Sequence, residues 1–381
     1  MTTTFNTEST IVSNALQIKV QKDRFLEAIT TVFGAISSKT TLPILANILI
    51  QSNGPDQIIL SGTDLELGIK TQCQATVLLQ GAITVPAKKF YEIIRELNSG
   101  EIEITVGKNN AVNIKISKSF FKIMGLEPDD FPKLPEPVAE QSFEMDRAVL
   151  KQCLSLTTFA ISRDETRYTL NGVLAMFKGK KARFVATDGK RLASIEKDIN
   201  LPSDVIFEVI IPAKTISEVV KAISDGQGKI KISLAQNQIM FQIDETTLIS
   251  RLIEGRFPNY EQVIPKDVKT KTEVSRQEFL SCLKRVSLLT SQENQAVKID
   301  FIKDHLLVSS RSPNTGEAKE EVPAKISGDD LTIGFNPNYI IDVLKNLDNE
   351  TITLAMTEPD KPGLIKNEEG YMYVVMPMQL S

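Results

Sequence analysis

Residue types on which much enzyme chemistry depends are scarce in this chain of 381 residues. It has one histidine, His305, three cysteines and no tryptophan. A single histidine excludes histidine-based catalytic triads and metal sites built from several histidines. Cys73, Cys153 and Cys282 lie far apart and form no CxxC pair, so neither a zinc site nor a disulfide framework is predicted. We therefore expect no metal and no other cofactor.

Signatures of nucleotide binding and of membranes are also missing. The sequence contains neither GxxxxGK nor GxGxxG. No apolar run approaches the ~20 residues that span a bilayer. Residues 1–15 are rich in Thr, Ser and Asn and lack the basic and apolar regions of a signal peptide, which predicts a flexible extension. These features predict a cytoplasmic protein that does not bind membranes.

The overall charge is slightly acidic, with 44 Lys and Arg against 48 Asp and Glu and a net charge of −4. Apolar and charged fractions of 41% and 24% are typical of a globular protein rather than a disordered one. The length predicts two or three domains, at roughly 100–200 residues each. Taken as an average, the excess of acidic residues argues against a nucleic-acid partner.

One pattern occurs three times, at a period near 125 residues. Its first element covers residues 18–37, 143–162 and 272–291, where apolar residues at helical spacing predict an amphipathic helix after a short strand. Ala28, Cys153 and Cys282 occupy equivalent positions on the apolar face of this helix. We therefore expect both thiols to fill the core rather than to react or bind metal.

Two further elements complete each repeat. Hairpins are predicted at 47–68, at 171–194 and, more weakly, at 297–313, and a second helix at 85–97, 211–223 and 335–347. Each repeat thus contains two helices and about eight strands, which predicts an α+β domain with both helices on one face of antiparallel sheet. The predicted domains are 16–140, 141–267 and 268–381.

Charge is unevenly distributed between the predicted helices and the rest of the chain. The six helical segments, 22–33, 88–97, 146–157, 214–223, 276–287 and 337–347, together carry a net charge of +5, which leaves −9 elsewhere. Each helix could simply have a solvated charged face. If all six line one surface, however, that surface would attract a polyanion such as DNA through its phosphates, without reading sequence.

Catalytic candidates are few. Asp64 and Asp188 occur at equivalent places in GTDLE and ATDGKR, where turn chemistry explains an aspartate better than catalysis does. A metal-dependent enzyme that uses these two residues remains one alternative, and a structural scaffold without DNA binding remains another. The C-terminal segment 371–381 combines a strand with methionines around Pro377, which is compatible with a closing edge strand or with a groove that accepts a peptide.

Seven strings then carry a family resemblance: TLPILANILI, GTDLE, VPAKKF, RYTLNG, VATDGKRLA, EGRFPNY and YVVMPM. They are similar to strings in the bacterial DNA polymerase III beta subunits, the ring-shaped sliding clamps, and the similarity is colinear from about residue 16 to 380. The resemblance implies a non-catalytic processivity factor, a head-to-tail homodimer that forms a closed ring around double-stranded DNA. It also implies docking of the replicative polymerase alpha subunit, the clamp loader, other polymerases and repair proteins through clamp-binding peptides.

The resemblance also assigns residues to three sites. The partner-peptide groove, an apolar slot in which Arg191 and backbone groups orient the ligand, maps to Leu170, Gly172, Thr187, Gly189, Arg191, Leu192, Pro258, Val263, Val374, Val375, Met376, Pro377 and Met378. The DNA-facing positions map to Lys39, Lys88, Lys89, Arg163, Tyr168 and Lys214. The dimer contact maps to Phe121 and Ile123 at one end and to Leu288 and Leu289 at the other. The chain departs from the family pattern on the groove rim and among the DNA contacts, at Asp164, Thr169, Lys190, Gln262 and Gln379.

Overall fold

The computed structural model describes residues 15–37, 40–134, 141–199, 206–223, 227–290, 295–312, 316–367 and 369–380. In these ranges the three sequence repeats form the same kinds of element in the same order. The six predicted helices are confirmed, and each begins and ends within two residues of its predicted limits. The predicted α+β class, with antiparallel sheet, is also confirmed.

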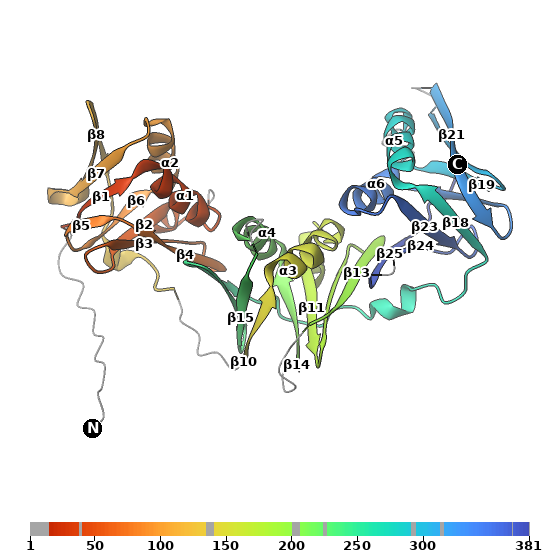
Figure 1. Cartoon of the computed structure of the whole chain (residues 1–381), viewed down its shortest axis with the longest axis horizontal. Helices are drawn as coiled ribbons and strands as arrows, with labels where there is room; N and C mark the ends of the chain where they lie inside the picture. The colour runs from red at the N-terminus through yellow and green to blue at the C-terminus, as the bar shows by residue number, and fades with distance from the viewer. Residues whose placement is uncertain are drawn as a thin grey trace. The chain divides into compact units, whose positions relative to one another are not determined.

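Each repeat contributes two α-helices and a set of short strands (Figure 1). The first repeat forms α1 (Lys22–Phe33), α2 (Ala87–Glu96), β1 (Gln17–Gln21), β2 (Asn47–Ser52), β3 (Gln57–Thr63), β4 (Leu67–Gln74), β5 (Thr76–Leu79), β6 (Ala82–Pro86), β7 (Glu101–Val106), β8 (Ala111–Ile116) and β9 (Ser119–Met124). The second forms α3 (Arg147–Ser155), α4 (Ala213–Ala222), β10 (Gln141–Asp146), β11 (Gly172–Lys178), β12 (Lys181–Thr187), β13 (Arg191–Asp198), β14 (Ile206–Pro212), β15 (Lys229–Ala235), β16 (Gln238–Ile243) and β17 (Thr246–Arg251). The third forms α5 (Arg276–Val286), α6 (Pro337–Asn346), β18 (Thr270–Ser275), β19 (Val297–Ile302), β20 (His305–Ser312), β21 (Gly316–Ser327), β22 (Leu331–Phe335), β23 (Thr351–Met356), β24 (Gly363–Lys366) and β25 (Tyr371–Val375).

The strands form three sheets, and two of these sheets cross from one repeat to the next. The sheet orders are β5-β1-β7-β8-β9, then β10-β15-β16-β17-β4-β3-β2-β6, then β14-β11-β12-β13-β25-β24-β23-β18-β21-β20-β19-β22. The crossings are the pairing of β4 with β17 and the pairing of β13 with β25, both antiparallel. Backbone hydrogen bonds therefore join the first repeat to the second and the second to the third.

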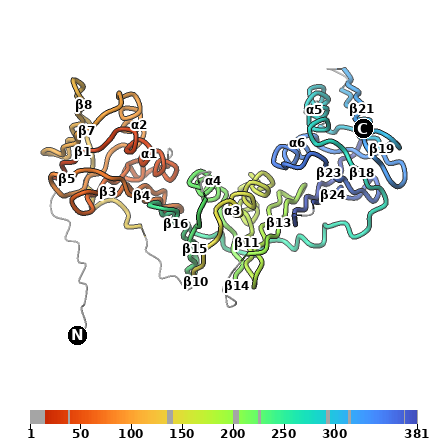
Figure 2. The backbone as a smooth tube through the Cα atoms, viewed as in Figure 1, coloured from red at the N-terminus to blue at the C-terminus, as the bar shows by residue number. Residues whose placement is uncertain are grey.

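The helices form because their apolar residues recur at helical spacing and are buried against neighbouring elements. On α1, Phe25 and Ile29 are fully buried, and the Phe25 ring meets that of Phe90 on α2 edge to face at 5.7 Å. In the third repeat, the backbone path of α5 and α6 beside β18, β23 and β24 can be followed in Figure 2. Cys153 and Cys282 are buried on the same face of α3 and α5, and burial raises the pKa of each thiol to about 12. The prediction that these thiols fill the core is confirmed.

The chain groups into two compact units. One contains the described parts of residues 1–144, 217–224 and 229–251, and the other those of 145–216, 225–228 and 252–381. The β4–β17 crossing lies in the first unit and the β13–β25 crossing in the second. The domain limits 16–140, 141–267 and 268–381 remain predictions, and residues 135–140 lie outside the described ranges. The predicted extension, residues 1–15, lies outside them except for its last residue.

Candidate functional site

The turn between β12 and β13 is held by the side chains of its own residues. Asp188 Oδ1 accepts the N–H groups of Lys190 and Arg191 at 2.9 and 3.0 Å, and Thr187 Oγ1 accepts that of Gly189 at 3.1 Å. Gly189 has a φ of +85°, a left-handed conformation that costs glycine nothing. These contacts are the turn chemistry that the sequence predicts for Asp188.

Asp64 forms the same turn in the first repeat. Its Oδ1 accepts the N–H groups of Glu66 and Leu67 at 3.0 and 2.7 Å. The turn interpretation is therefore confirmed for both aspartates. Within the described ranges, no group of three or more His, Cys, Asp or Glu side chains is placed to hold a metal ion.

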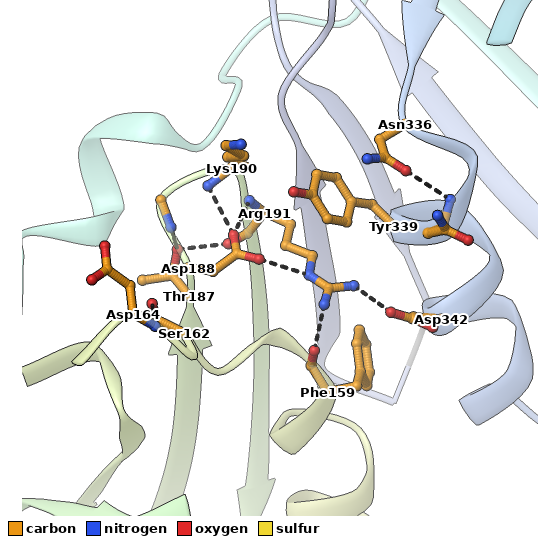
Figure 3. Close-up of polar contacts among 12 residues, drawn as sticks. Phe159, Ser162, Asp164, Thr187, Asp188, Lys190, Arg191, Asn336, Tyr339 and Asp342 are labelled. Atoms are coloured by element: carbon orange, nitrogen blue, oxygen red, sulfur yellow. Dashed lines mark hydrogen bonds and ion pairs between the residues drawn. The ribbon is translucent and has the colours of Figure 1, made fainter. Parts of the chain in front are cut away.

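Arg191 follows the β12–β13 turn, and its guanidinium is bound entirely by residues of this chain (Figure 3). Nε donates to Asp188 Oδ2 at 3.1 Å, Nη1 to Asp342 Oδ2 at 2.7 Å, and Nη2 to the Phe159 carbonyl at 2.6 Å. Asp188 and Phe159 belong to the second repeat, whereas Asp342 lies on α6 of the third. Arg191 therefore uses Nε and Nη2 within its own repeat and connects that repeat to the third through Nη1.

Aromatic rings enclose the same guanidinium. Its carbon lies 4.6 Å from the ring centre of Tyr339 and 5.7 Å from that of Phe159. The Tyr373 hydroxyl donates to the Tyr339 carbonyl at 2.8 Å. Burial alone would lower the pKa of Arg191, but the hydrogen bond to Asp342 and the surrounding negative charge outweigh it and raise that pKa. The side chain is only 10% exposed, so its contacts are shielded from salt and water.

An apolar cluster lies beneath the predicted groove. Its buried members come from both repeats that meet at the β13–β25 crossing: Leu174, Val185, Leu192, Ile210, Leu364 and Val374. Half-buried side chains pack against this cluster, including Phe257, Tyr260 and Ile264. The cluster thus provides a continuous apolar base shared by the second and third repeats.

The C-terminal segment crosses this apolar base between the β12–β13 turn and β22. The Met376 N–H donates to the Lys190 carbonyl at 2.9 Å, and the Met378 N–H donates to the Gly334 carbonyl of β22 at 2.8 Å. A side chain at Gly334 would collide with the Met378 carbonyl, because an ideal Cβ there lies 2.6 Å from that oxygen. Met376 is 38% exposed, so its thioether is available to a ligand.

A short 3-10 turn, Tyr260–Val263, carries the exposed Val263 and is tied to the sheet through Arg183. Arg183 Nε donates to Glu196 at 2.9 Å, and Nη1 donates to the Tyr260 hydroxyl at 3.3 Å. Hydrogen bonds from Lys181 and Arg183 lower the pKa of Glu196, which keeps it ionised. The turn that bears Val263 is therefore fixed by a polar group outside the apolar base.

Comparisons with known proteins agree with this architecture along the whole chain. Family models for the DNA polymerase III beta subunit match residues 16–135 (N-terminal domain), 144–259 (central domain) and 261–379 (C-terminal domain). The chain belongs to the bacterial beta sliding clamps. Its relatives include the beta sliding clamp of Chlamydia pneumoniae, 32% identical over 96% of this chain and 99% of that protein.

Solved clamp structures match as well. The DNA polymerase sliding clamp of Bacillus subtilis has a TM-score of 0.92 at 30% identity, over 97% of this chain and all of that one. The sliding clamp of Bartonella birtlesii bound to griselimycin has a TM-score of 0.92 at 32% identity, over 96% of this chain and all of that one. The fold of this chain is therefore the clamp fold, and its role is that of a processivity factor in DNA replication.

The structure brings the predicted groove residues of this clamp together around the β13–β25 crossing. Six line its buried part: Leu170, Gly172, Thr187, Leu192, Val374 and Val375. The rest are exposed or half-buried around it: Gly189, Arg191, Pro258, Val263, Met376, Pro377 and Met378. Their role as a groove remains a prediction, as does the orienting role of Arg191. The departures at the groove rim, Lys190, Gln262 and Gln379, are exposed.

The predicted DNA-facing residues are exposed wherever the structure describes them. Lys88 and Lys89 lie in the first turn of α2, Lys214 lies in the first turn of α4, and Arg163 and Tyr168 lie in or beside the 3-10 segment Glu165–Leu170. Lys39 lies outside the described residues. Asp164 caps that 3-10 segment and pairs with Arg167 at 2.9 Å. Thr169, in the same 3-10 segment, is half-buried beside Gly255.

The predicted dimer residues lie at the surfaces of their own repeats. Phe121 is 38% exposed on the edge strand β9, and Ile123 is half-buried there. Leu288 is 77% exposed in the 3-10 turn after α5, and Leu289 is half-buried. Beside Phe121 is a cavity of about 330 Å³ between α2 and the β8–β9 hairpin, whose apolar lining includes Ile93, Leu97 and Ile116.

The sequence interpretation missed the residues that surround Arg191, namely Phe159, Tyr339, Asp342 and Tyr373. One signal was present, because Tyr339 and Asp342 are three residues apart and so share a face of the predicted helix 337–347. Spacing along one helix does not reveal which residue of another repeat that face meets.

Proposed function

We propose that this chain is half of a closed homodimeric ring that encircles duplex DNA and recruits replication and repair proteins without catalysing a reaction itself. One observation carries the proposal: in the described residues, the first and the third repeat each expose an apolar site beside a strand that is paired on one side only. The protein would act in the cytoplasm, where a bacterial chromosome is replicated.

The proposed dimer joins β9 of one protomer to β21 of the other. β9 is an edge strand, and residues 316–323 of β21 pair with β20 on one side only within the described part of the chain. If β9 and β21 paired, the backbone N–H and C=O groups on the free edge of each strand would hydrogen-bond to those of the other. Leu288 of the same end would then enter the cavity beside Phe121, which removes two exposed apolar side chains from water.

The charges next to these strands support the same pairing. β9 carries the exposed Lys122, whereas residues 316–323 of β21 carry the exposed Glu317 and Glu321 against one exposed lysine, Lys319. Opposite charges on facing strands favour one partner and one register. Because β9 and β21 are at different ends of the chain, the contact is head to tail and closes after a fixed number of copies.

DNA would be held by phosphate contacts. The basic residues proposed for it, Lys88, Lys89, Arg163 and Lys214, are exposed and lie on helices or beside a 3-10 segment. Such contacts do not distinguish bases, which suits a protein that moves along DNA. Lys39 and Tyr168 are proposed to take part as well.

Partner peptides would bind at the β13–β25 crossing. The apolar base, the exposed Met376 and Val263, and the backbone groups of the β12–β13 turn provide a slot for apolar side chains. We propose that the polymerase alpha subunit, the clamp loader and repair proteins present such side chains here. We also propose that griselimycin, which is bound to the Bartonella birtlesii clamp, binds this chain at the same place.

Retention on circular and on linear DNA tests whether the protein forms a closed ring around the duplex. The protein is loaded by a clamp loader onto a nicked circular duplex, and retention is measured before and after the circle is cut at one site. We expect long retention on the circle and rapid loss from the cut molecule, together with a mass in solution near twice 42.3 kDa. Equal retention on both shapes would rule out topological binding.

A further inference from the structure

The Arg191–Asp342 contact lies within a closed path of contacts around Pro377. From Arg191 the path runs one residue back to the Lys190 carbonyl, which holds Met376 at 2.9 Å. Two residues on, Met378 is held by Gly334 of β22 at 2.8 Å. After β22 the chain enters α6 through Asn336, whose side chain accepts the Asn338 N–H at 3.0 Å. Asp342 on α6 then returns to Arg191 at 2.7 Å and completes the path.

In this path Arg191 joins the second repeat directly to α6 through its ion pair with Asp342 and through the packing of its guanidinium on the Tyr339 ring. The remaining links are backbone hydrogen bonds, the Asn336 side-chain cap and covalent chain. Arg191 also packs against the aromatic rings of Phe159 and Tyr339, which restricts the movement of its guanidinium. A planar guanidinium with all three nitrogens engaged has one orientation, so it fixes the position of Asp342 relative to the β12–β13 turn.

The equivalent place in the first unit shows what happens without this arginine. The residue after the matching turn is Leu67, which is 1% exposed. The residue that matches Asp342 in the sequence repeat is Glu218 of α4, whose carboxylate lies against Gly34, where a Cβ would not fit. Lys221 of the same helix pairs with Glu218 at 2.7 Å. At that crossing the carboxylate pairs with a lysine of its own helix rather than with a residue of the β3–β4 turn.

We propose that Asp342 is a positioning residue for the partner-peptide groove: it holds Arg191 so that Met376, Pro377 and Met378 form one wall of the groove at a fixed distance from the β12–β13 turn. Asp342 need not touch the ligand, because it acts through Arg191. This inference rests on the proposed groove and adds to it a residue that no sequence signal assigned.

Griselimycin binding to the full-length protein tests the proposal. Dissociation constants and rates are measured for wild type, Asp342→Asn and Asp342→Glu. The asparagine keeps the size of the side chain but loses its charge, so we expect affinity to fall about tenfold, mainly through faster dissociation. The glutamate keeps the charge and should recover part of the loss.

Arg276→Ala provides the matched control. Arg276 also anchors α6, by donating to the carbonyls of Asn349, just beyond the helix, and of Leu344, two residues after Asp342, at 2.8 and 3.0 Å. We expect this variant to lose thermal stability and keep its griselimycin affinity within twofold. Wild-type affinity in Asp342→Asn, or an equal loss of affinity in Arg276→Ala, would overturn the proposal.

Hydrogen exchange without ligand separates this inference from the proposed groove. In Asp342→Asn the amides of Lys190, Met376 and Met378 should exchange at least fivefold faster, whereas amides of β18 should be unchanged. If wild type does not bind griselimycin, the groove assignment fails, and the exchange rates still decide whether Asp342 sets the position of the wall. Unchanged exchange at these three amides would overturn the positioning role.

Discussion

The two places where a sheet crosses from one repeat to the next have the same backbone and different side chains. At the β4–β17 crossing the Arg251 N–H donates to the Glu66 carbonyl at 2.9 Å, and at the β13–β25 crossing the Met376 N–H donates to the Lys190 carbonyl at 2.9 Å. Both turns are capped by an aspartate. The backbone alone therefore does not make a binding site.

Three of the differences between the crossings bear on binding. The left-handed residue of the turn is Leu65, with a φ of +77°, at the first crossing, and Gly189 at the second. The residue after the turn is the buried Leu67 at the first and Arg191 at the second. The residue just past the last paired residue of β17 at the first crossing is the charged Arg251. At the second crossing the residue just past the last paired residue of β25 is the apolar Met376. The second crossing is thus more open, more apolar at its surface and held by an ion pair.

Replacing Arg191 by leucine makes the second crossing resemble the first and has the largest expected effect. The change leaves Asp188 and Asp342 without their cationic partner in a half-buried site. We expect a loss of about 3 kcal/mol in the free energy of unfolding, measured by urea denaturation followed by circular dichroism. A loss below about 1 kcal/mol would show that the network contributes little at this crossing.

Removing the methionine side chains tests the apolar surface of the second crossing. Met376→Ala combined with Met378→Ala should weaken griselimycin binding about 30-fold, or roughly 2 kcal/mol, because two apolar contacts are lost. The dimer mass should not change. Arg251→Ala, at the matching place of the first crossing, is the control and should leave affinity unchanged. Unaltered affinity in the methionine variant would contradict the groove assignment.

Replacing the left-handed residue of each turn by the residue type found in the other turn should change the free energy of unfolding in opposite directions. Leu65→Gly should stabilise the protein by about 1 kcal/mol, because glycine adopts a positive φ without strain. Gly189→Leu should destabilise it by about the same amount, because leucine would have to adopt a positive φ there, and should also weaken griselimycin binding, since Gly189 is one of the proposed groove residues. Thermal denaturation and calorimetric titration of both variants check this pair. Changes of the same sign in both variants would refute the turn argument.

The smallest expected effect concerns the exposed ion pair of the first crossing. Arg251 Nη1 and Glu66 Oε1 are 3.9 Å apart, and both side chains are more than half exposed. Solvent screening makes such pairs weak, so Glu66→Ala should change the free energy of unfolding by less than about 0.5 kcal/mol. A change above 1 kcal/mol in urea denaturation would mean that the first crossing also depends on an ion pair.

Much of the fold could be predicted because its signals are local. The helices follow from apolar spacing around residues such as Phe25 and Phe279, and the turns follow from Asp64 and Asp188. The buried thiols follow from the register that equates Cys153 and Cys282 with Ala28. Each of these inferences needs only neighbouring residues or the internal repeat.

The rest depends on contacts between repeats, which spacing does not encode. The sequence interpretation placed Arg191 in the groove as a ligand-orienting group, but the structure shows its nitrogens bound to Asp188, Asp342 and Phe159. The partner on α6 lies 151 residues away in sequence. No pattern in the sequence predicts that Arg183 holds the 3-10 turn that carries Val263.

A crystal structure of this protein with griselimycin tests whether only the second crossing binds ligands. We expect one ligand per chain, at the β13–β25 crossing, in contact with Met376 and Val263, and no ligand at the β4–β17 crossing. Occupancy of the β4–β17 crossing, or a ligand bound away from both, would contradict it.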